Sequence, residues 1–315
     1  MIENMPENNI YLPEGLRPQT ALTLPVLRDA MERQTILEGA AIRCDCYRNL
    51  LVDLGGIPGY LPRREAIAPW INGAGRDIAL LSRVGKPVCF LVTDIRSDEK
   101  GAPVVILSRR AVQEQAREHF LSVLRPGSVL SAVVTHLESF GAFLDIGCGI
   151  IAMLPIENIS VSRIPHPGIR FRPGQRILAA VSAIDPALPR FTMTHKELLG
   201  TWMENASYFH PGDTVPGVVR SVKEYGCFVE LTPNLSGLAD RSPGVAEGDR
   251  VSVYIRSIRP ERMKIKLHII ERLPPDPVPR PPRYQITDGQ LDRWVYSPPG
   301  CEKEPVETVF TNPSP

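Results

Sequence analysis

The chain has 315 residues and is 43% hydrophobic, enough apolar material to bury the cores of two or three ordinary domains. A formal net charge of +1 argues against a polybasic tail and neither requires nor excludes an RNA partner. The polar, acidic N-terminus is unlike a signal peptide and no apolar run reaches a membrane span, so we expect a cytoplasmic protein without a membrane partner, its cysteines reduced.

Residues 1–33 form an N-terminal segment, in which a short helix is predicted from Leu24 to Arg33. Residues 34–110 are a degenerate copy of a module that recurs later, because LLVDLGGIPGYLPRREA resembles AFLDIGCGIIAMLPIEN with one gap. A linker helix is predicted over 111–126, where apolar residues recur at helical spacing. These residues are Val112, Ala116, Phe120 and Val123.

The second module, 127–196, and the third, 212–270, are the clearest copies. SVLSAVVTHLESFGAFLDI and DTVPGVVRSVKEYGCFVEL align without a gap at an offset of 85 residues. The strands predicted in the second module are Val129–Leu137, Gly141–Ile146, Ile150–Leu154, Arg176–Ile184 and Phe191–Thr194. Five strands in about 70 residues is the size of an OB-fold barrel. We therefore expect an all-β fold of tandem five-stranded OB-fold barrels joined by short helices.

Residues 197–211 are predicted as a second linker helix, between the second and third modules. Thr194 and Glu197 have the spacing of a capping box, which would satisfy free N–H groups at the start of that helix. Its apolar face would be formed by Leu198, Trp202 and Ala206.

The tail, 271–315, holds eleven prolines, a composition that favours extended or polyproline II structure. Two interpretations stay open for it. One is a partly disordered tail. The other is a segment, 283–297, that folds against a barrel through Trp294 and Tyr296.

The stretch FLDIGCGIIA fits the G-x-G-x-x-A pattern of a nucleotide-binding turn and is similar to a methyltransferase signature. Such a turn needs a helix immediately after it, whereas Ile150 to Pro155 has the pattern of a strand. The third module has no glycine pair at this place. We therefore interpret Gly147 and Gly149 as hairpin-turn residues and disfavour a methyltransferase. Since no Walker, kinase or HExxH pattern occurs either, we expect no enzyme activity, cofactor or metal.

Paired aromatic residues are the more informative feature. Strand alternation places Phe143 on the same face as Asp145, which we expect to be exposed to water, and Gly141 allows Phe140 to join that face. The third module repeats the arrangement with Tyr225, Phe228 and Glu230. Stacking on nucleic-acid bases, at about 1–3 kcal/mol per base, explains exposed aromatic pairs well. The alternative is that the rings cap a barrel end or lie under a linker helix.

The stretch GSVLSAVVTHLESFGAFLDIGCGIIAMLPIENIS resembles the S1 RNA-binding domain, and the tandem arrangement resembles short members of the bacterial ribosomal protein S1 family. The resemblance covers 127–270 well and 34–110 loosely, and it leaves the tail unexplained. It implies single-stranded RNA bound by two aromatics, a histidine after strand three, and polar and basic residues near strands four and five. Carried over by position, it implies an RNA face of Phe140, Phe143, Arg163, Asp185, Arg190, Tyr225, Phe228, Asp240 and Arg262.

The chain departs from the family pattern at the histidine position. Pro155 stands there in the second module, and Asp240 stands there in the third. We expect Asp240 to repel phosphate unless Arg241 or Arg259 neutralises it.

The first module has Arg48 and Leu51 in the places of the two aromatics, so we expect a structural or protein-contacting role for it. The other modules are only weakly cationic, which predicts modest affinity unless several bind together. The resemblance implies a non-enzymatic protein that binds single-stranded mRNA at the small ribosomal subunit in translation. An RNA-binding regulator or decay factor away from the ribosome and a protein-interaction scaffold stay open as alternatives.

Overall fold

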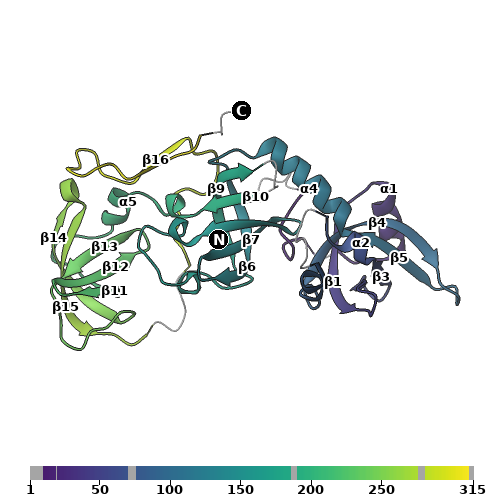
Figure 1. Cartoon of the computed structure of the whole chain (residues 1–315), viewed down its shortest axis with the longest axis horizontal. Coiled ribbons are helices and arrows are strands. Elements are labelled where there is room, and N and C mark those ends of the chain that lie inside the picture. The colour runs from purple at the N-terminus through teal and green to yellow at the C-terminus, as the bar shows by residue number, and fades with distance from the viewer. Residues whose placement is uncertain (1–9, 19, 70–75, 186–189, 276–280, 312–315) are drawn as a thin grey trace. The chain divides into compact units, whose positions relative to one another are not determined.

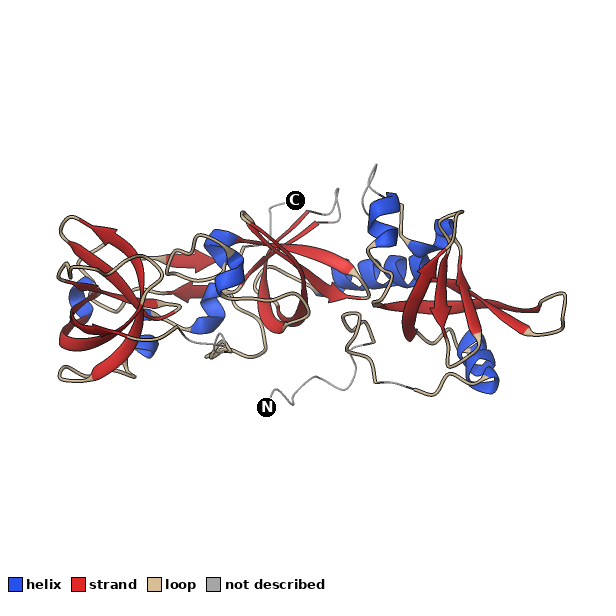
Figure 2. Ribbon diagram, turned by 90° about the horizontal axis from the view of Figure 1, so that it is seen from below, coloured by secondary structure: helices blue, strands red, loops and turns tan. Residues whose placement is uncertain are grey.

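The computed structural model describes residues 10–18, 20–69, 76–185, 190–275 and 281–311. Strands β1 to β15 form three closed five-stranded barrels that follow one another in the sequence, which confirms the predicted all-β fold of tandem barrels. Figure 1 and Figure 2 show these strands and the short helices between them. Unit 1 comprises Met1–Leu124, Asp145–Ala152 and Asp185–Arg190, and unit 2 comprises Arg125–Leu144, Met153–Ile184 and Phe191–Pro315. Among the described residues, no helix is long and apolar enough to span a membrane.

Barrel one follows the helix α1 (Leu24–Glu32). Its strands, in the order β1-β2-β3-β5-β4, are β1 (Leu37–Cys44), β2 (Leu50–Asp53), β3 (Pro58–Leu61), β4 (Pro87–Ser97) and β5 (Pro103–Ser108). The short helices α2 (Arg63–Ala66) and α3 (Arg76–Leu81) lie between β3 and β4. Alternate residues point inward, so that Leu50 and Val52 are buried while Leu51 is partly exposed.

The helix α4 (Arg109–Val123) joins barrels one and two in sequence and buries Val112, Ala116 and Phe120. Barrel two has the order β10-β8-β7-β6-β9. Its strands end within one residue of the predicted ones: β6 (Val129–Glu138), β7 (Gly141–Gly147), β8 (Ile150–Pro155), β9 (Arg176–Asp185) and β10 (Arg190–Thr194). Two 3₁₀ turns, η1 (Ile156–Asn158) and η2 (Pro167–Ile169), precede β9.

The turn between β7 and β8 is the hairpin that the sequence predicted. Cys148 and Gly149 have φ values of 50° and 75°, the left-handed region that a tight two-residue hairpin requires. The next element is the strand β8 and not a helix. A nucleotide-binding turn would place its ligand against a helix N-terminus, so the local geometry disfavours that interpretation.

Barrel three repeats the strand order of barrel one, as β11-β12-β13-β15-β14. Its strands are β11 (Thr214–Lys223), β12 (Gly226–Thr232), β13 (Leu235–Ala239), β14 (Arg250–Arg259) and β15 (Lys264–Arg272), with the turn η4 (Pro260–Arg262) before the last. Gly226 has φ of 148°, and a Cβ there would lie 2.4 Å from the Ala239 carbonyl oxygen. This close approach of β12 to β13 therefore requires glycine.

The second linker differs from its prediction. It forms the 3₁₀ turn η3 (Lys196–Leu199), a break at Gly200 with φ of 86°, and the short helix α5 (Trp202–Ala206). The capping box lies at Thr201 and Glu204, so its predicted position at Thr194 and Glu197 was wrong. The break separates the predicted apolar face, because Trp202 packs into the core of barrel three while Leu198 packs with Leu178 and Ala180.

The described part of the tail folds within unit 2. Trp294 and Tyr296 are buried in the core cluster of barrel three, and the Tyr296 hydroxyl donates to the Asn234 carbonyl at 2.6 Å. The strand β16 (Arg293–Val295) pairs with β17 (Glu307–Val309). Of the two interpretations of the tail, packing against a barrel through Trp294 and Tyr296 is therefore confirmed for residues 283–297.

Candidate nucleic-acid interface

The aromatic pair of barrel two is presented at the β6–β7 turn. Phe140 lies in the turn with 55% of its surface exposed, and Phe143 follows on β7, half-buried. Their ring centroids are 6.1 Å apart at an interplanar angle of 89°. His136 on β6 stacks beside Phe143, with centroids 6.3 Å apart at 27°. The sequence interpretation missed this histidine, although its place on β6 near the turn was a usable signal.

Barrel three repeats the pair with nearly the same geometry. Tyr225 is 69% exposed, and its ring centroid lies 6.2 Å from that of Phe228 at 88°. On the outer face of the barrel, Phe228 lies opposite Ser221 on β11 and Leu238 on β13. Both aromatic pairs belong to unit 2. Two edge-to-face ring pairs with open faces therefore stand in one compact unit.

The two acids expected to share the exposed face are buried, so that expectation was wrong. Asp145 is 2% exposed and Glu230 is 6% exposed. Strand alternation correctly places Asp145 and Glu230 on the outer faces of their strands, but distant segments of the chain cover those faces at these two residues. Each carboxylate is bound by groups distant in the sequence, which strand alternation does not reveal.

Asp145 accepts hydrogen bonds from backbone N–H groups of its own hairpin and of the N-terminal segment. Its Oδ1 accepts from Gly147 at 2.8 Å and Gly149 at 3.0 Å, and its Oδ2 accepts from Glu14 at 2.9 Å. Burial, together with the nearby Glu14 carboxylate, raises the pKa of Asp145 to about 7 against the opposite effect of these bonds. Asp145 is thus a structural group of unit 1.

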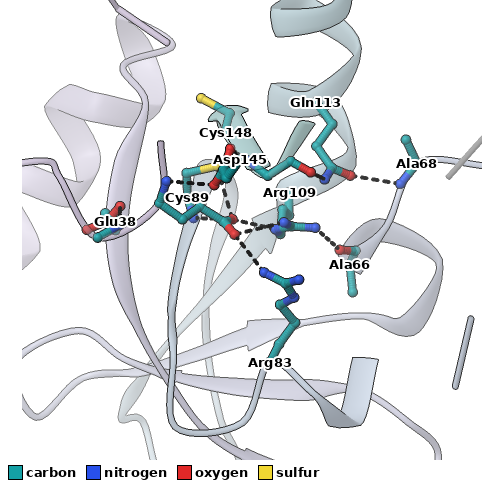
Figure 3. Close-up of polar contacts among 12 residues, drawn as sticks. Glu38, Ala66, Ala68, Arg83, Cys89, Arg109, Gln113, Asp145 and Cys148 are labelled. Atoms are coloured by element: carbon teal, nitrogen blue, oxygen red, sulfur yellow. Dashed lines mark hydrogen bonds and ion pairs between the residues drawn. The ribbon is translucent and has the colours of Figure 1, made fainter. Parts of the chain in front are cut away.

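The Glu14 carboxylate beside it is held by Arg109 and Arg83, the two arginines labelled in Figure 3. Arg109 Nε and Nη2 donate to it at 2.6 and 2.9 Å, and Arg83 Nη1 donates at 3.1 Å. Burial alone would raise the pKa of Glu14, but Arg109 and Arg83 outweigh burial and hold it below its ordinary value. Burial also raises the pKa of the neighbouring Cys89 thiol, which keeps it protonated.

Glu230 is bound by two arginines at once. Arg170, in the loop after η2, donates to both carboxylate oxygens at 2.8 and 2.6 Å, and Arg220 on β11 donates to both at 2.8 and 3.0 Å. Burial tends to raise the pKa of Glu230, but Arg220 and Arg170 lower it below its ordinary value. Because Arg170 lies between β8 and β9 of barrel two and Glu230 lies on β12 of barrel three, this pairing links the two barrels within unit 2.

The other charged residues of the predicted RNA face are exposed. Arg163 lies in the loop between η1 and η2, Asp185 is the last residue of β9, and Arg190 is the first residue of β10. Asp185 and Arg190 belong to unit 1, whereas Arg163 belongs to unit 2 with Phe143. Their participation in one RNA face with Phe140 and Phe143 stays a prediction.

In barrel three, Asp240 directly follows the last residue of β13. Its carboxylate forms an ion pair with Arg256 Nη1 on β14 at 3.2 Å. The neutralising partner is therefore Arg256, where Arg241 or Arg259 was expected. Arg262 Nε lies 3.0 Å from the Glu302 carboxylate of the tail.

Tyr254 on β14 and His268 on β15 are exposed cross-strand neighbours on barrel three. The sequence interpretation did not include these two rings among the candidate surface residues. Their alternation with buried neighbours was the available signal.

Comparison with known proteins agrees with this geometry. A family model described as the S1 RNA binding domain matches residues 123–196. The small ribosomal subunit protein bS1 of Staphylococcus aureus (strain COL) is 32% identical over 288 residues, covering 86% of this chain and 71% of that protein. The chain belongs to the bS1 family. The bS1 homolog of Bacillus subtilis (strain 168) is 30% identical over 243 residues, covering 71% of this chain.

This bS1-family chain spans 61% of the length of the Bacillus subtilis protein and 60% of that of the bS1 protein of Leuconostoc lactis. Among solved structures, a multidomain protein with nucleic acid binding domains from Streptococcus pneumoniae is 15% identical with a TM-score of 0.26. That alignment covers 75% of this chain and 73% of the other, and its low TM-score adds nothing to the family assignment. The family model covers the barrel of the bS1-family chain that carries Phe140 and Phe143.

Proposed function

We propose that this chain is a non-enzymatic, cytoplasmic protein that binds single-stranded RNA through barrels two and three. The observation that carries the proposal is the repeated pair of edge-to-face rings, Phe140 with Phe143 and Tyr225 with Phe228. Exposed aromatic faces on a barrel offer every base a stacking surface, whatever its sequence, at about 1–3 kcal/mol per base. Exposed cations of the same two barrels, such as Arg163 and Arg256, suit the phosphate backbone.

The presence of both ring pairs in unit 2 supports binding of one strand by two barrels. The pairing of Arg170 in barrel two with Glu230 in barrel three limits the motion of the Tyr225–Phe228 pair relative to the Phe140–Phe143 pair. A strand that has bound one pair then meets the other at a raised effective concentration. This compensates for the modest positive charge of each barrel.

We further propose that the RNA is mRNA and that the chain acts in translation at the small ribosomal subunit. The support for this part is the family, because the Staphylococcus aureus relative is named as a protein of that subunit. Co-sedimentation of the full chain with small subunits, with and without single-stranded RNA, tests it. Binding to RNA without binding to the subunit would favour an RNA regulator or decay factor that works elsewhere.

A further inference from the structure

We propose that barrel one carries a third contact for single-stranded RNA, in which Tyr47 and Tyr60 stack on bases. The proposal rests on the RNA-binding function proposed above and extends it to a barrel whose sequence has lost the aromatic pair of the other two. Leu51 does stand at the place of the second aromatic. The structure nevertheless brings two other rings to the same side of the barrel.

The strand register identifies the first of these rings. In barrel three, Phe228 lies in a row across the outer face between Ser221 and Leu238. The corresponding row of barrel one has Leu51 on β2 between Arg43 on β1 and Tyr60 on β3. The aromatic ring has therefore moved by one strand within the same row, from the place of Phe228 to that of Leu238.

The second ring is presented by the β1–β2 loop. The loop is closed at its base, where Asp45 N donates to the Asn49 carbonyl at 2.9 Å and Asn49 N donates to Asp45 Oδ1 at 2.8 Å. Arg48 takes the left-handed conformation with φ of 67°, and Tyr47 beside it is 78% exposed. Tyr47 thus occupies the loop tip, as Phe140 and Tyr225 occupy the equivalent turns of the other barrels.

The two tyrosines belong to one local surface. Partial burial, with Asp45 and Cys46 of the loop nearby, raises the pKa of the Tyr60 hydroxyl. The strand register shows the same proximity, because Tyr60 pairs with Leu51, two residues after Asn49 closes the loop that carries Tyr47. The hydroxyl stays neutral at physiological pH, so the ring adds no charge that would repel phosphate.

A cationic hollow adjoins this surface at Asn49. The cavity measures about 790 Å³, and its lining includes Asn49, Pro62, Arg63, Arg64, Glu65 and Arg110. Among the described residues of that lining, Glu65 is the only acid, and it accepts from Ser108 Oγ at 2.7 Å and from Arg110 at 3.2 Å. Arg64, 88% exposed at its side chain, stands at this hollow. Aromatic rings beside arginines are the combination that binds single strands, the rings to bases and the cations to phosphates.

Photo-crosslinking of the full chain to single-stranded RNA that contains 4-thiouridine tests the proposal directly. Peptide mapping should find adducts at Tyr47 or Tyr60 as well as at the aromatic pairs of barrels two and three. Adducts at Phe140, Phe143, Tyr225 or Phe228 without any in residues 43–61 would overturn this inference and leave the proposed function intact. Absence of adducts at all three barrels would overturn both.

Two substitutions give a second readout in the full chain. Tyr60→Leu installs the residue that barrel three has in this register, and Tyr47→Ala alters an exposed loop tip, so both should preserve the fold. The double variant should bind a long unstructured RNA about fivefold more weakly or worse, the equivalent of one lost base stack. Ile78→Ala, at an apolar residue 77% exposed on α3, is the matched control and should leave affinity unchanged. Unchanged affinity of the double variant would overturn the inference in favour of a protein-contacting surface.

Discussion

Phe140 and Phe143 meet edge to face, with ring centroids 6.1 Å apart at 89°, and the same relationship recurs in barrel three at 6.2 Å and 88°. Full burial would be worth about 1.5–3 kcal/mol for each such ring, yet Phe140 and Tyr225 remain more than half exposed. Folding alone gives no reason to keep the same open geometry in two barrels. A ligand with flat apolar faces does.

Removing the Glu230 charge from its pairing with Arg170 and Arg220 should strongly destabilise unit 2. Glu230→Gln keeps the side-chain volume but leaves two arginines, 12% and 13% exposed, without their countercharge. We expect a loss on the order of 3 kcal/mol in the free energy of unfolding, measured by urea denaturation. Glu302→Gln breaks the exposed pair with Arg262 and should cost less than about 1 kcal/mol. Equal effects of the two variants would contradict this account.

His195 predicts an acid-sensitive step in unit 2. Its Nδ1 bonds the Ile159 carbonyl at 2.8 Å, and its Nε2 bonds the Tyr284 hydroxyl of the tail at 3.2 Å, an arrangement that suits the neutral ring. Burial lowers the pKa of His195 from 6.5 to about 4. As the pH falls, His195 is therefore protonated in the unfolded chain before it is protonated in the folded chain. Its contribution to the free energy of unfolding is full above pH 6.5 and is lost as the pH falls toward 4.

The expected slope in that window is up to about 1.4 kcal/mol per pH unit. Urea midpoints followed by the fluorescence of Trp202 and Trp294, which both lie in unit 2, measure it. His195→Asn should flatten the slope between pH 6.5 and the onset of carboxylate titration. A variant that keeps the wild-type slope would assign the acid sensitivity to another group.

Asp240 offers a gain-of-binding prediction. Its carboxylate lies 3.2 Å from Arg256 on β14, where we expect it to compete with phosphate for that cation. Asp240→His should strengthen RNA binding, because Arg256 is released and a hydrogen-bond donor replaces an acid. Asp240→Asn separates the two effects, since it removes only the charge. Unchanged affinity in both variants, with circular dichroism as for the wild type, would place Asp240 away from the RNA path.

Strand alternation and the internal repeat predicted most of the fold, because both are local or periodic signals. They placed the five strands of barrel two, the aromatic pairs, and a hairpin turn at Gly147 and Gly149, of which Gly147 ends β7 and Gly149 lies in the turn. The local sequence does not show which distant segment covers a strand face. Asp145 is covered by Glu14, 131 positions away, and Glu230 by Arg170, 60 positions away, so the sequence interpretation wrongly placed both acids in contact with water.

Two other differences have equally specific causes. The capping box shifted from Thr194 to Thr201 because Gly200 breaks the linker in a left-handed conformation, which only the packed structure shows. Tyr47 and Tyr60 were missed because the match by sequence position compared Arg48 and Leu51 alone. The equivalence of Tyr60 to Leu238 depends on the register of three strands, and this becomes visible only in the folded barrel.

The most direct test of the account is the affinity of the full chain for an unstructured RNA of about 12 nucleotides, measured at several salt concentrations. Phe143→Ala and Phe228→Ala should each cost about 1–3 kcal/mol without changing the slope of log affinity against log salt, because neither ring carries charge. Arg190→Ala and Arg262→Ala should make the slope shallower by about 0.7 each if they neutralise one phosphate. Val309→Ala, at an exposed residue of β17 in the tail, is the control. Unchanged affinity in both phenylalanine variants would contradict the account and favour a protein-binding role for these surfaces.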